Sequence, residues 1–182
     1  MHYKKLSIIF LSTIFLFSLM SAPAYAANNR SKNRTSNNAI SIKETDKSSI
    51  IYLYQEEKLA RDLYNKFYEK WGLTVFKNIA KSEQRHMNSV ASLASKFGTA
   101  LPKDLAAGSF NDTNLQALYN KLLNDGLKSK EEALKAAALV EKTDISDLQK
   151  TIAGTKDASI NRLLNSLKKG SENHLKAFNR NM

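Results

Sequence analysis

Four stretches of this 182-residue chain carry apolar residues at steps of three and four, and each apolar row is broken by an ionisable or metal-capable side chain. Steps of three and four place side chains on one face of an α-helix. The stretches are residues 50–72, 74–98, 129–152 and 157–178, each about 20 residues long. Four amphipathic helices of this length predict a helical bundle whose interior holds ionisable or metal-capable side chains among the packed apolar ones.

The residues between these stretches support an all-α fold. Gly72 and Gly98 are expected to end the first two helices, and Thr74 to cap the second. Ser129 and Glu132 form a capping box that opens the third. A looser connection over residues 98–112 leads to a short helix over residues 113–124. With only two prolines, six glycines and no strand-like alternation, the sequence predicts an all-α, four-helix bundle with a short extra helix in the connection between its halves.

The predicted inward faces contain both apolar residues and interruptions. The apolar residues are Leu53, Ala60, Tyr64, Phe67, Trp71, Phe76, Ile79, Val90, Leu93, Phe97, Leu134, Ala137 or Ala138, Ile145, Leu148, Ile152, Ile160, Leu164, Leu167 and Phe178. The interruptions are Glu57, Glu83, His86, Glu141, Asp144, Ser171 and His174. We therefore expect the polar groups of all four helices to meet in the core.

Carboxylates that meet in a core need compensation, because each one buried without a partner costs several kcal/mol. A divalent or trivalent cation provides it. Glu83 and His86 stand at i and i+3, on one face of a helix. Glu-x-x-His, with single glutamates from other helices, is the arrangement of di-iron and di-manganese carboxylate proteins. The alternative is a structural buried Glu–His ion pair, and the coincidence across four helices favours the metal site.

The N-terminus has the features of an export signal. Lys4 and Lys5 precede an apolar run over residues 6–20 and an Ala-Tyr-Ala sequence, which predicts a signal peptide over residues 1–26, cleaved after Ala26. Cleavage would remove two lysines, no acidic residue and His2, so the net charge falls from +11 to +9 and two histidines remain. Residues 27–49 are almost entirely polar and predict a flexible linker before a bundle domain over residues 50–182. We expect a secreted or extracytoplasmic protein with no stable membrane insertion after cleavage.

Two segments resemble known helices of metal-binding bundles. The run Glu57-Lys58-Leu59-Ala60-Arg61-Asp62-Leu63-Tyr64 resembles the E-x-x-A-R-x-x-Y first helix of rubrerythrin-like proteins. The run Ile79-Ala80-Lys81-Ser82-Glu83-Gln84-Arg85-His86 resembles their second, I-A-x-x-E-x-x-H. The stretch over residues 52–178 is more closely similar to the ferritin-like "domain of unknown function 2202" family. The resemblance implies a ferritin-like bundle and leaves the reaction open.

The resemblance also implies roles for the interrupting residues. Glu57 would be the ligand of the first helix, with Glu141 as its counterpart in the third. Glu83 would be a bridging carboxylate, His86 a terminal ligand, and His174 its counterpart in the fourth helix.

The fourth helix departs from the ferritin-like pattern, because a second E-x-x-H would need a carboxylate where this chain has Ser171. Asp144 is the candidate to restore the fourth carboxylate. Glu172 points about 100° away from the direction of Ser171. A dinuclear iron or manganese site is expected, with a mononuclear site as the alternative.

We expect redox chemistry of the ferroxidase or peroxide type, with O₂ or peroxide as the small oxidant. Whether the protein is an enzyme stays open, as does its oligomeric state. The alternative is a non-enzymatic exported basic module that binds anionic envelope polymers, lipid headgroups, nucleic acid or a protein partner. Its lysines are scattered and no nucleic-acid motif is present, so specific nucleic-acid binding is not expected. The absence of cysteine excludes thiolate chemistry, and hydrolysis fits poorly because a narrow bundle has little room for a bulky substrate.

Overall fold

The computed structural model describes residues 42–103 and 105–182, and their regular structure is entirely helical. The predicted signal peptide and most of the predicted linker lie outside these residues. The helices are α1 (Glu44–Trp71), α2 (Thr74–Lys96), α3 (Thr113–Gly126), α4 (Lys130–Gly154) and α5 (Ala158–Asn181). The predicted all-α bundle with a short extra helix is confirmed.

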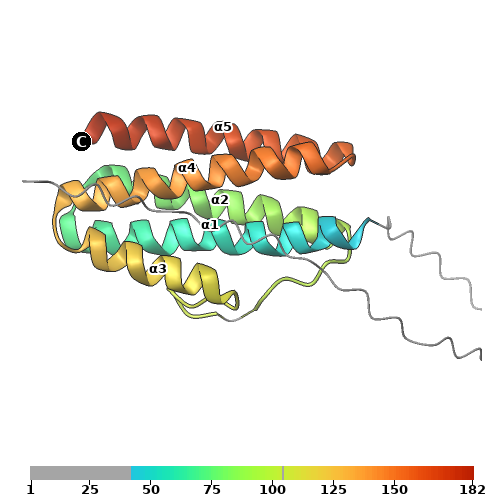
Figure 1. Cartoon of the computed structure of the whole chain (residues 1–182), viewed down its shortest axis with the longest axis horizontal. Helices are drawn as coiled ribbons and strands as arrows, with labels where there is room; N and C mark the ends of the chain where they lie inside the picture. The colour runs from blue at the N-terminus through green and yellow to red at the C-terminus, as the bar shows by residue number, and fades with distance from the viewer. Residues whose placement is uncertain (1–41, 104) are drawn as a thin grey trace, which may run out of the picture. The chain divides into compact units, whose positions relative to one another are not determined.

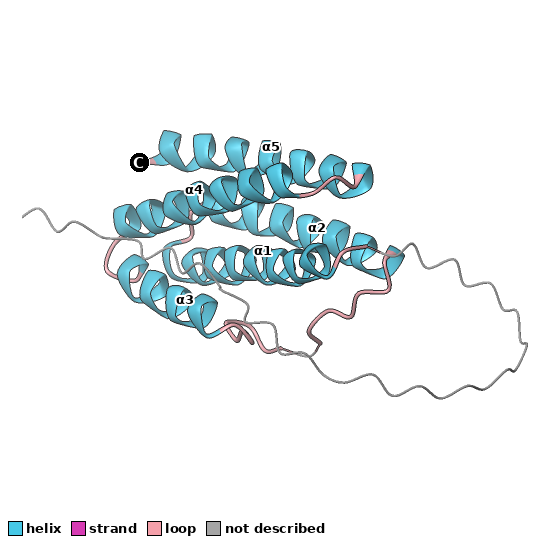
Figure 2. Cartoon of the chain, turned by 45° about the vertical axis from the view of Figure 1, so that its right-hand side comes forward, coloured by secondary structure: helices cyan, strands magenta, loops and turns pink. Residues whose placement is uncertain are grey.

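The four long helices form the bundle, and α3 lies on its outside against α1 and α4 (Figure 1). Helix α1 packs beside α2 and α4, and α5 completes the ring by packing beside the same two helices. Helices α2 and α4 run in one direction and α1 and α5 in the other (Figure 1). The segment between α2 and α4 therefore returns along the length of the bundle, as Figure 2 shows from a second side. One long crossover of this kind is the connectivity of ferritin-like folds.

The helix ends follow the local sequence in most places. Gly72 ends α1 in the left-handed conformation, with φ of 69°. The side chain of Ser129 accepts a hydrogen bond from the backbone N–H of Glu132, as the capping box predicted. Asp157 caps α5 in the same way. The expected cap at Thr74 is wrong, because Leu73 occupies that position without a side-chain bond and Thr74 is the first helical residue.

Helix α1 begins earlier than the boundary expected between linker and bundle. Its first residue is Glu44, so residues 44–49 belong to the helix and not to a flexible linker. Glu44 supplies a negative charge at the helix N-terminus and pairs with Lys47 at 3.1 Å. The hydroxyl groups of Ser48 and Ser49 donate to backbone carbonyls one turn earlier, and Ile50 is buried. These contacts extend a helix through residues whose composition is polar.

The apolar core consists of two clusters, one towards each end of the bundle. Each cluster contains residues from all four long helices. In each helix the interrupting polar residues lie between the two clusters. Glu83, for example, follows Ile79 of one cluster and precedes Val90 of the other. Polar groups from four helices therefore share one level of the bundle.

The crossover segment is fixed to α1 by a buried ion pair. Lys58 Nζ lies 2.6 Å from Asp62 Oδ2 and donates to the carbonyl oxygen of Ala106 at 2.8 Å. Asp62 Oδ2 also accepts from the backbone N–H of Gly108 at 2.9 Å. These contacts hold the loop before α3 against the first helix.

Within the described ranges 42–103 and 105–182, none of the helices has the length and apolar character needed to cross a membrane.

Candidate metal centre

We call this shared level the polar layer; its residues are Glu57, Glu83, His86, Glu141, Asp144, Ser171 and His174. Glu83 stands at its middle and contacts both histidines of the bundle. Its Oε2 lies 2.8 Å from His86 Nδ1, on the same helix. Its Oε1 lies 2.7 Å from His174 Nδ1, which α5 contributes. One ligand atom from each of these three residues lies within 4.8 Å of the others. The spacing of Glu83 and His86 arises from one helical turn, whereas the contact with His174 depends on the packing of α2 against α5.

A glutamate lies beside each histidine. Glu57 Oε2, on α1, is 3.2 Å from His86 Nδ1, and Glu141 Oε2, on α4, is 3.6 Å from His174 Nδ1. Tyr64 donates a 2.7 Å hydrogen bond to Glu141 Oε1 and so fixes this carboxylate from the side away from the histidine. The layer therefore has two halves, each with one imidazole and one glutamate, and Glu83 touches both.

The sixth predicted residue, Asp144, joins the same layer through a different contact. Its Oδ2 accepts a 2.6 Å hydrogen bond from the hydroxyl group of Ser171. Asp144 lines one cavity with Glu57, Glu83 and Glu141. Asp144 thus brings a carboxylate from α4 to the position of Ser171 on α5, where the ferritin-like pattern would have supplied one.

Several buried ligand-type atoms of the layer lack a hydrogen-bond partner among the described residues. They are Glu57 Oε1, Glu83 Oε1, Asp144 Oδ1 and His174 Nδ1. Glu83 Oε1 and His174 Nδ1 are close to each other, yet their geometry does not make a hydrogen bond. Buried polar atoms are nearly always partnered, so a group of orphaned atoms at one level calls for an explanation. Carboxylate oxygens and an imidazole nitrogen are the donors that iron and manganese accept, and the residues fit such an ion.

The histidines and the central glutamate favour their charged forms. Burial disfavours the imidazolium of His86, but its contacts with Glu57 and Glu83 outweigh this effect and raise its pKa to about 10. The pKa of His174 rises to about 9 because its contacts with Glu141 and Glu83 likewise outweigh burial. Burial also disfavours the charged form of Glu83, and the two histidines overcome it and lower its pKa to about 2.

The flanking carboxyl groups of Glu57, Glu141 and Asp144 instead favour their neutral, protonated forms. Burial is the main cause that raises the pKa of Glu141 to about 8 and of Asp144 to about 7. Burial, with the nearby charge of Asp144, also raises the pKa of Glu57 well above its ordinary value. The metal-free layer therefore carries protons at neutral pH that a cation would displace.

A small cavity lies within the layer. Its volume is about 20 Å³, enough for about one water-sized molecule. Carboxylate side chains form one part of its wall, and the apolar side chains of Leu115, Leu118 and Val140 form another. Leu115 and Leu118 belong to α3, so the short extra helix covers the polar layer. The sequence predicted this helix but not its position over the site.

The position of His86 depends on a glycine of α5. A Cβ atom added at Gly170 would lie 2.7 Å from both Cε1 and Nε2 of the His86 ring, closer than such atoms approach. The rings of His86 and His174 stack with their centroids 5.3 Å apart. The missing side chain at Gly170 therefore leaves space for one imidazole beside the other.

The structure brings all six predicted residues together and places two further carboxylates, Glu56 and Asp147, at the border of this group, where the sequence analysis missed them. Glu56 lines the cavity beside Glu57. Burial, with the charges of Asp144 and Asp147, raises the pKa of Glu56 well above its ordinary value. Asp147 follows Asp144 by three residues, so the two share a helix face. The D-x-x-D spacing was the signal for Asp147, whereas Glu56 lies about 100° around α1 from Glu57 and outside the predicted inward row.

Comparison with known proteins identifies the family of this chain. Residues 46–182 match the model of the family described as an uncharacterized protein domain (DUF2202). The uncharacterized protein MJ0754 of Methanocaldococcus jannaschii is 44% identical over 138 residues, which are 75% of each chain. The crystal structure of hypothetical protein MJ0754 from Methanococcus jannaschii has a TM-score of 0.75 and 41% identity, covering 84% of both chains. The chain belongs to the DUF2202 family.

Proposed function

We propose that this protein is an exported metal-binding protein with a carboxylate and histidine site for iron or manganese in the core of its bundle. The observation that carries the proposal is the position of Glu83 between two histidines, each with its own flanking glutamate. This set supports a dinuclear site, and Glu83 would be shared between the two ions. Glu57 and His86 would hold one ion, and Glu141 and His174 the other. Asp144 supplies the fourth carboxylate.

The donor set supports iron or manganese. Carboxylates and imidazoles suit these ions, and the chain has no cysteine that could supply a thiolate. When bound, such an ion supplies electrons to a small oxidant such as O₂ or peroxide. The mononuclear alternative would use Glu83, His86 and His174 alone, since their ligand atoms form the tightest group.

The residues around the layer define what the protein itself would contribute. The cavity admits a small molecule and excludes a bulky substrate, which supports a ferroxidase or peroxide-related reaction over hydrolysis. Leu115, Leu118 and Val140 limit the access of water on one side. Tyr64 orients Glu141 through its hydrogen bond. Export is proposed from the signal-peptide pattern of residues 1–26.

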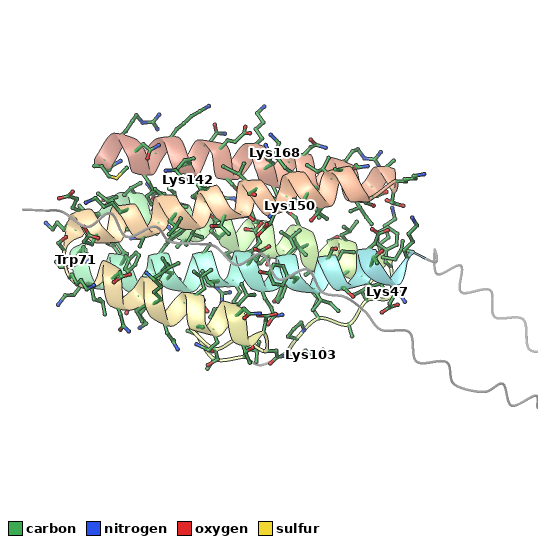
Figure 3. The ribbon with its side chains drawn as sticks, viewed as in Figure 1. Lys47, Trp71, Lys103, Lys142, Lys150 and Lys168 are labelled. Atoms are coloured by element: carbon green, nitrogen blue, oxygen red, sulfur yellow. The ribbon has the colours of Figure 1, made fainter. Side chains whose placement is uncertain are left out.

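The charge distribution gives less support to the alternative basic module. The labelled lysines in Figure 3 are Lys47 near the start of α1, Lys103 in the crossover, Lys142 and Lys150 on α4, and Lys168 on α5. They are spread along the molecule and over several elements. A scattered positive surface of this kind supports solubility, whereas a polymer-binding module would gain affinity from a dense patch.

Metal analysis tests the proposal directly. Protein reconstituted with Fe(II) or Mn(II) and passed through a desalting column should retain up to two equivalents of metal. Glu83→Ala and His86→Ala should remove most of this binding, whereas Glu172→Ala should not, because Glu172 pairs with Lys168 outside the layer. Crystals soaked with metal and measured by anomalous scattering would locate the ions. Retention below about a tenth of an equivalent by the unmodified protein would contradict the proposal.

A further inference from the structure

A second hollow lies beside the polar layer, between α1 and α4. Its volume is about 260 Å³, and its polar lining consists of Ser48, Ser49, Tyr52, Glu56, Asp147 and Thr151. Tyr52 is 37% exposed and Ser48 is also exposed, so the hollow opens to solvent. We call it the α1–α4 groove. Its hydroxyl and carboxylate groups offer oxygen ligands to a cation.

Glu56 belongs to both hollows. It lines the α1–α4 groove together with Asp147, and it lines the inner cavity together with Glu57 and Asp144. Glu56 is thus a partly buried carboxylate that the groove and the inner cavity share. A cation that reached Glu56 from the groove would already stand at the edge of the inner cavity.

The inner side of this boundary contains free acceptors. Asp144 Oδ1 and Glu57 Oε1 have no hydrogen-bond partner in the described part of the chain, and their residues are only 9% and 2% exposed. Both residues line the cavity that Glu56 also lines. Oxygen atoms therefore lie on both sides of Glu56, in the groove and in the inner cavity.

On the outer side, Asp147 is paired with an exposed lysine that a cation can replace. Lys150 Nζ lies 2.7 Å from Asp147 Oδ1, but its side chain is 73% exposed. Ion pairs as exposed as this contribute little to stability. Lys150 can swing into solvent when a divalent cation takes its place on Asp147.

We propose that the α1–α4 groove is the route by which divalent cations reach the core, with the carboxylates of Glu56 and Asp147 as their first, transient ligands. The inference rests on the proposed function, because it assumes a metal site in the core. It assigns to Glu56 and Asp147 the transfer of the ion and not its final binding. A cation that binds in the groove would displace the proton that burial favours on Glu56 and the ammonium group of Lys150 from Asp147.

The test separates the rate of loading from the final occupancy. The Glu56→Gln/Asp147→Asn double variant keeps the shape of both side chains and replaces their carboxyl groups with amides. Stopped-flow mixing of the metal-free protein with Mn²⁺, followed through the EPR signal of free Mn²⁺, gives the loading rate. We expect the rate to fall about tenfold or more, with the number of ions bound at equilibrium unchanged and the dissociation constant within about threefold.

Two further variants complete the design. Glu69→Gln/Glu131→Gln removes two charges from exposed ion pairs elsewhere on the bundle and should load at the normal rate. Ser48→Trp leaves both acidic groups in place, fills the mouth of the groove and should also slow loading. Increasing salt should slow the unmodified protein more than the double variant.

The outcomes distinguish this inference from the proposed function. A normal loading rate in the double variant would overturn the route while leaving the core site intact. A loss of bound ions at equilibrium would overturn it as well, because Glu56 and Asp147 would then be permanent ligands. If the unmodified protein bound no Mn²⁺ at all, the proposed function would fail, and the route with it.

Discussion

The hydroxyl group of Ser171 donates a 2.6 Å hydrogen bond to Asp144 Oδ2 and joins α5 to α4 in the centre of the bundle. Both residues are buried. The short side chain of Ser171 leaves the place of a carboxylate open, and the carboxylate of Asp144 reaches the cavity from the neighbouring helix. The carboxylate that the ferritin-like pattern would place on α5 thus comes from α4 in this chain.

The Ser171–Asp144 contact predicts a selective effect on metal affinity. Ser171→Ala removes the donor that orients Asp144, and partners of this kind change metal affinity by about 10- to 100-fold. We expect about tenfold weaker binding of one metal equivalent, measured by competition with a chelator. Ser166→Ala, at an exposed position on the same helix, is the control. Equal affinities in the two variants would show that Asp144 does not act as a ligand.

Tyr64 provides a second test of the supporting contacts. Tyr64→Phe removes the hydrogen bond to Glu141 Oε1, which also helps to keep this carboxylate ionised. A cation must then displace a more firmly held proton, so metal affinity should fall by about tenfold, with a larger loss at pH 6 than at pH 8. Tyr68→Phe, at a half-buried position one turn later, should bind metal normally. A loss without pH dependence would argue against this role.

Gly170 predicts a variant that keeps the fold and disturbs the site. Alanine in place of glycine stabilises a helix interior by up to about 1 kcal/mol, but at Gly170 the new methyl group would meet the His86 ring. Gly170→Ala should therefore remain helical by circular dichroism while retaining less metal. Gly154→Ala has open space around the added atom and should retain metal fully. Normal retention in both variants would show that His86 can move without consequence.

The pKa shifts predict how the stability of the metal-free protein depends on pH. Glu141 and Asp144 keep their protons up to about pH 8 and 7 when folded, against ordinary values of 4.5 and 3.8. His86 and His174 keep theirs up to about pH 10 and 9, against 6.5. From about pH 5 to 9 the folded state therefore binds more protons than the unfolded state, and its free energy of unfolding falls as pH rises.

Glu83 acts in the other direction, because its lowered pKa gives stability that is present above about pH 4.5 and lost as pH falls towards 2. Urea unfolding of chelator-treated protein should thus give a lower free energy of unfolding at pH 9 than at pH 6, by more than about 1 kcal/mol. Protein loaded with Mn²⁺ should lose this decline, because binding requires deprotonated ligands. Metal-free protein that became more stable from pH 6 to pH 9 would contradict the assignment.

The sequence was sufficient to predict the order of the helices and the polar residues that face inwards. Apolar steps of three and four indicated the buried sides of α1, α2, α4 and α5, and most of the residues expected in the core are buried. Ile145, Ile152, Leu93 and Trp71 are half-buried, since they lie at the edges of these faces. The pair Glu83 and His86 could be recognised because one helical turn fixes their relative position.

The sequence by itself determined which side of each helix is buried and which residues interrupt it, because both follow from a fixed rotation of about 100° per residue. Only the tertiary structure decided the relative heights of the four helices. Those heights place Glu57 beside His86, Glu141 beside His174 and Asp144 against Ser171. A shift of one helix by a single residue would move its side chains by about 1.5 Å along the axis. Packing and the crossover connection set these shifts. The spacing of residues within one helix does not reveal them.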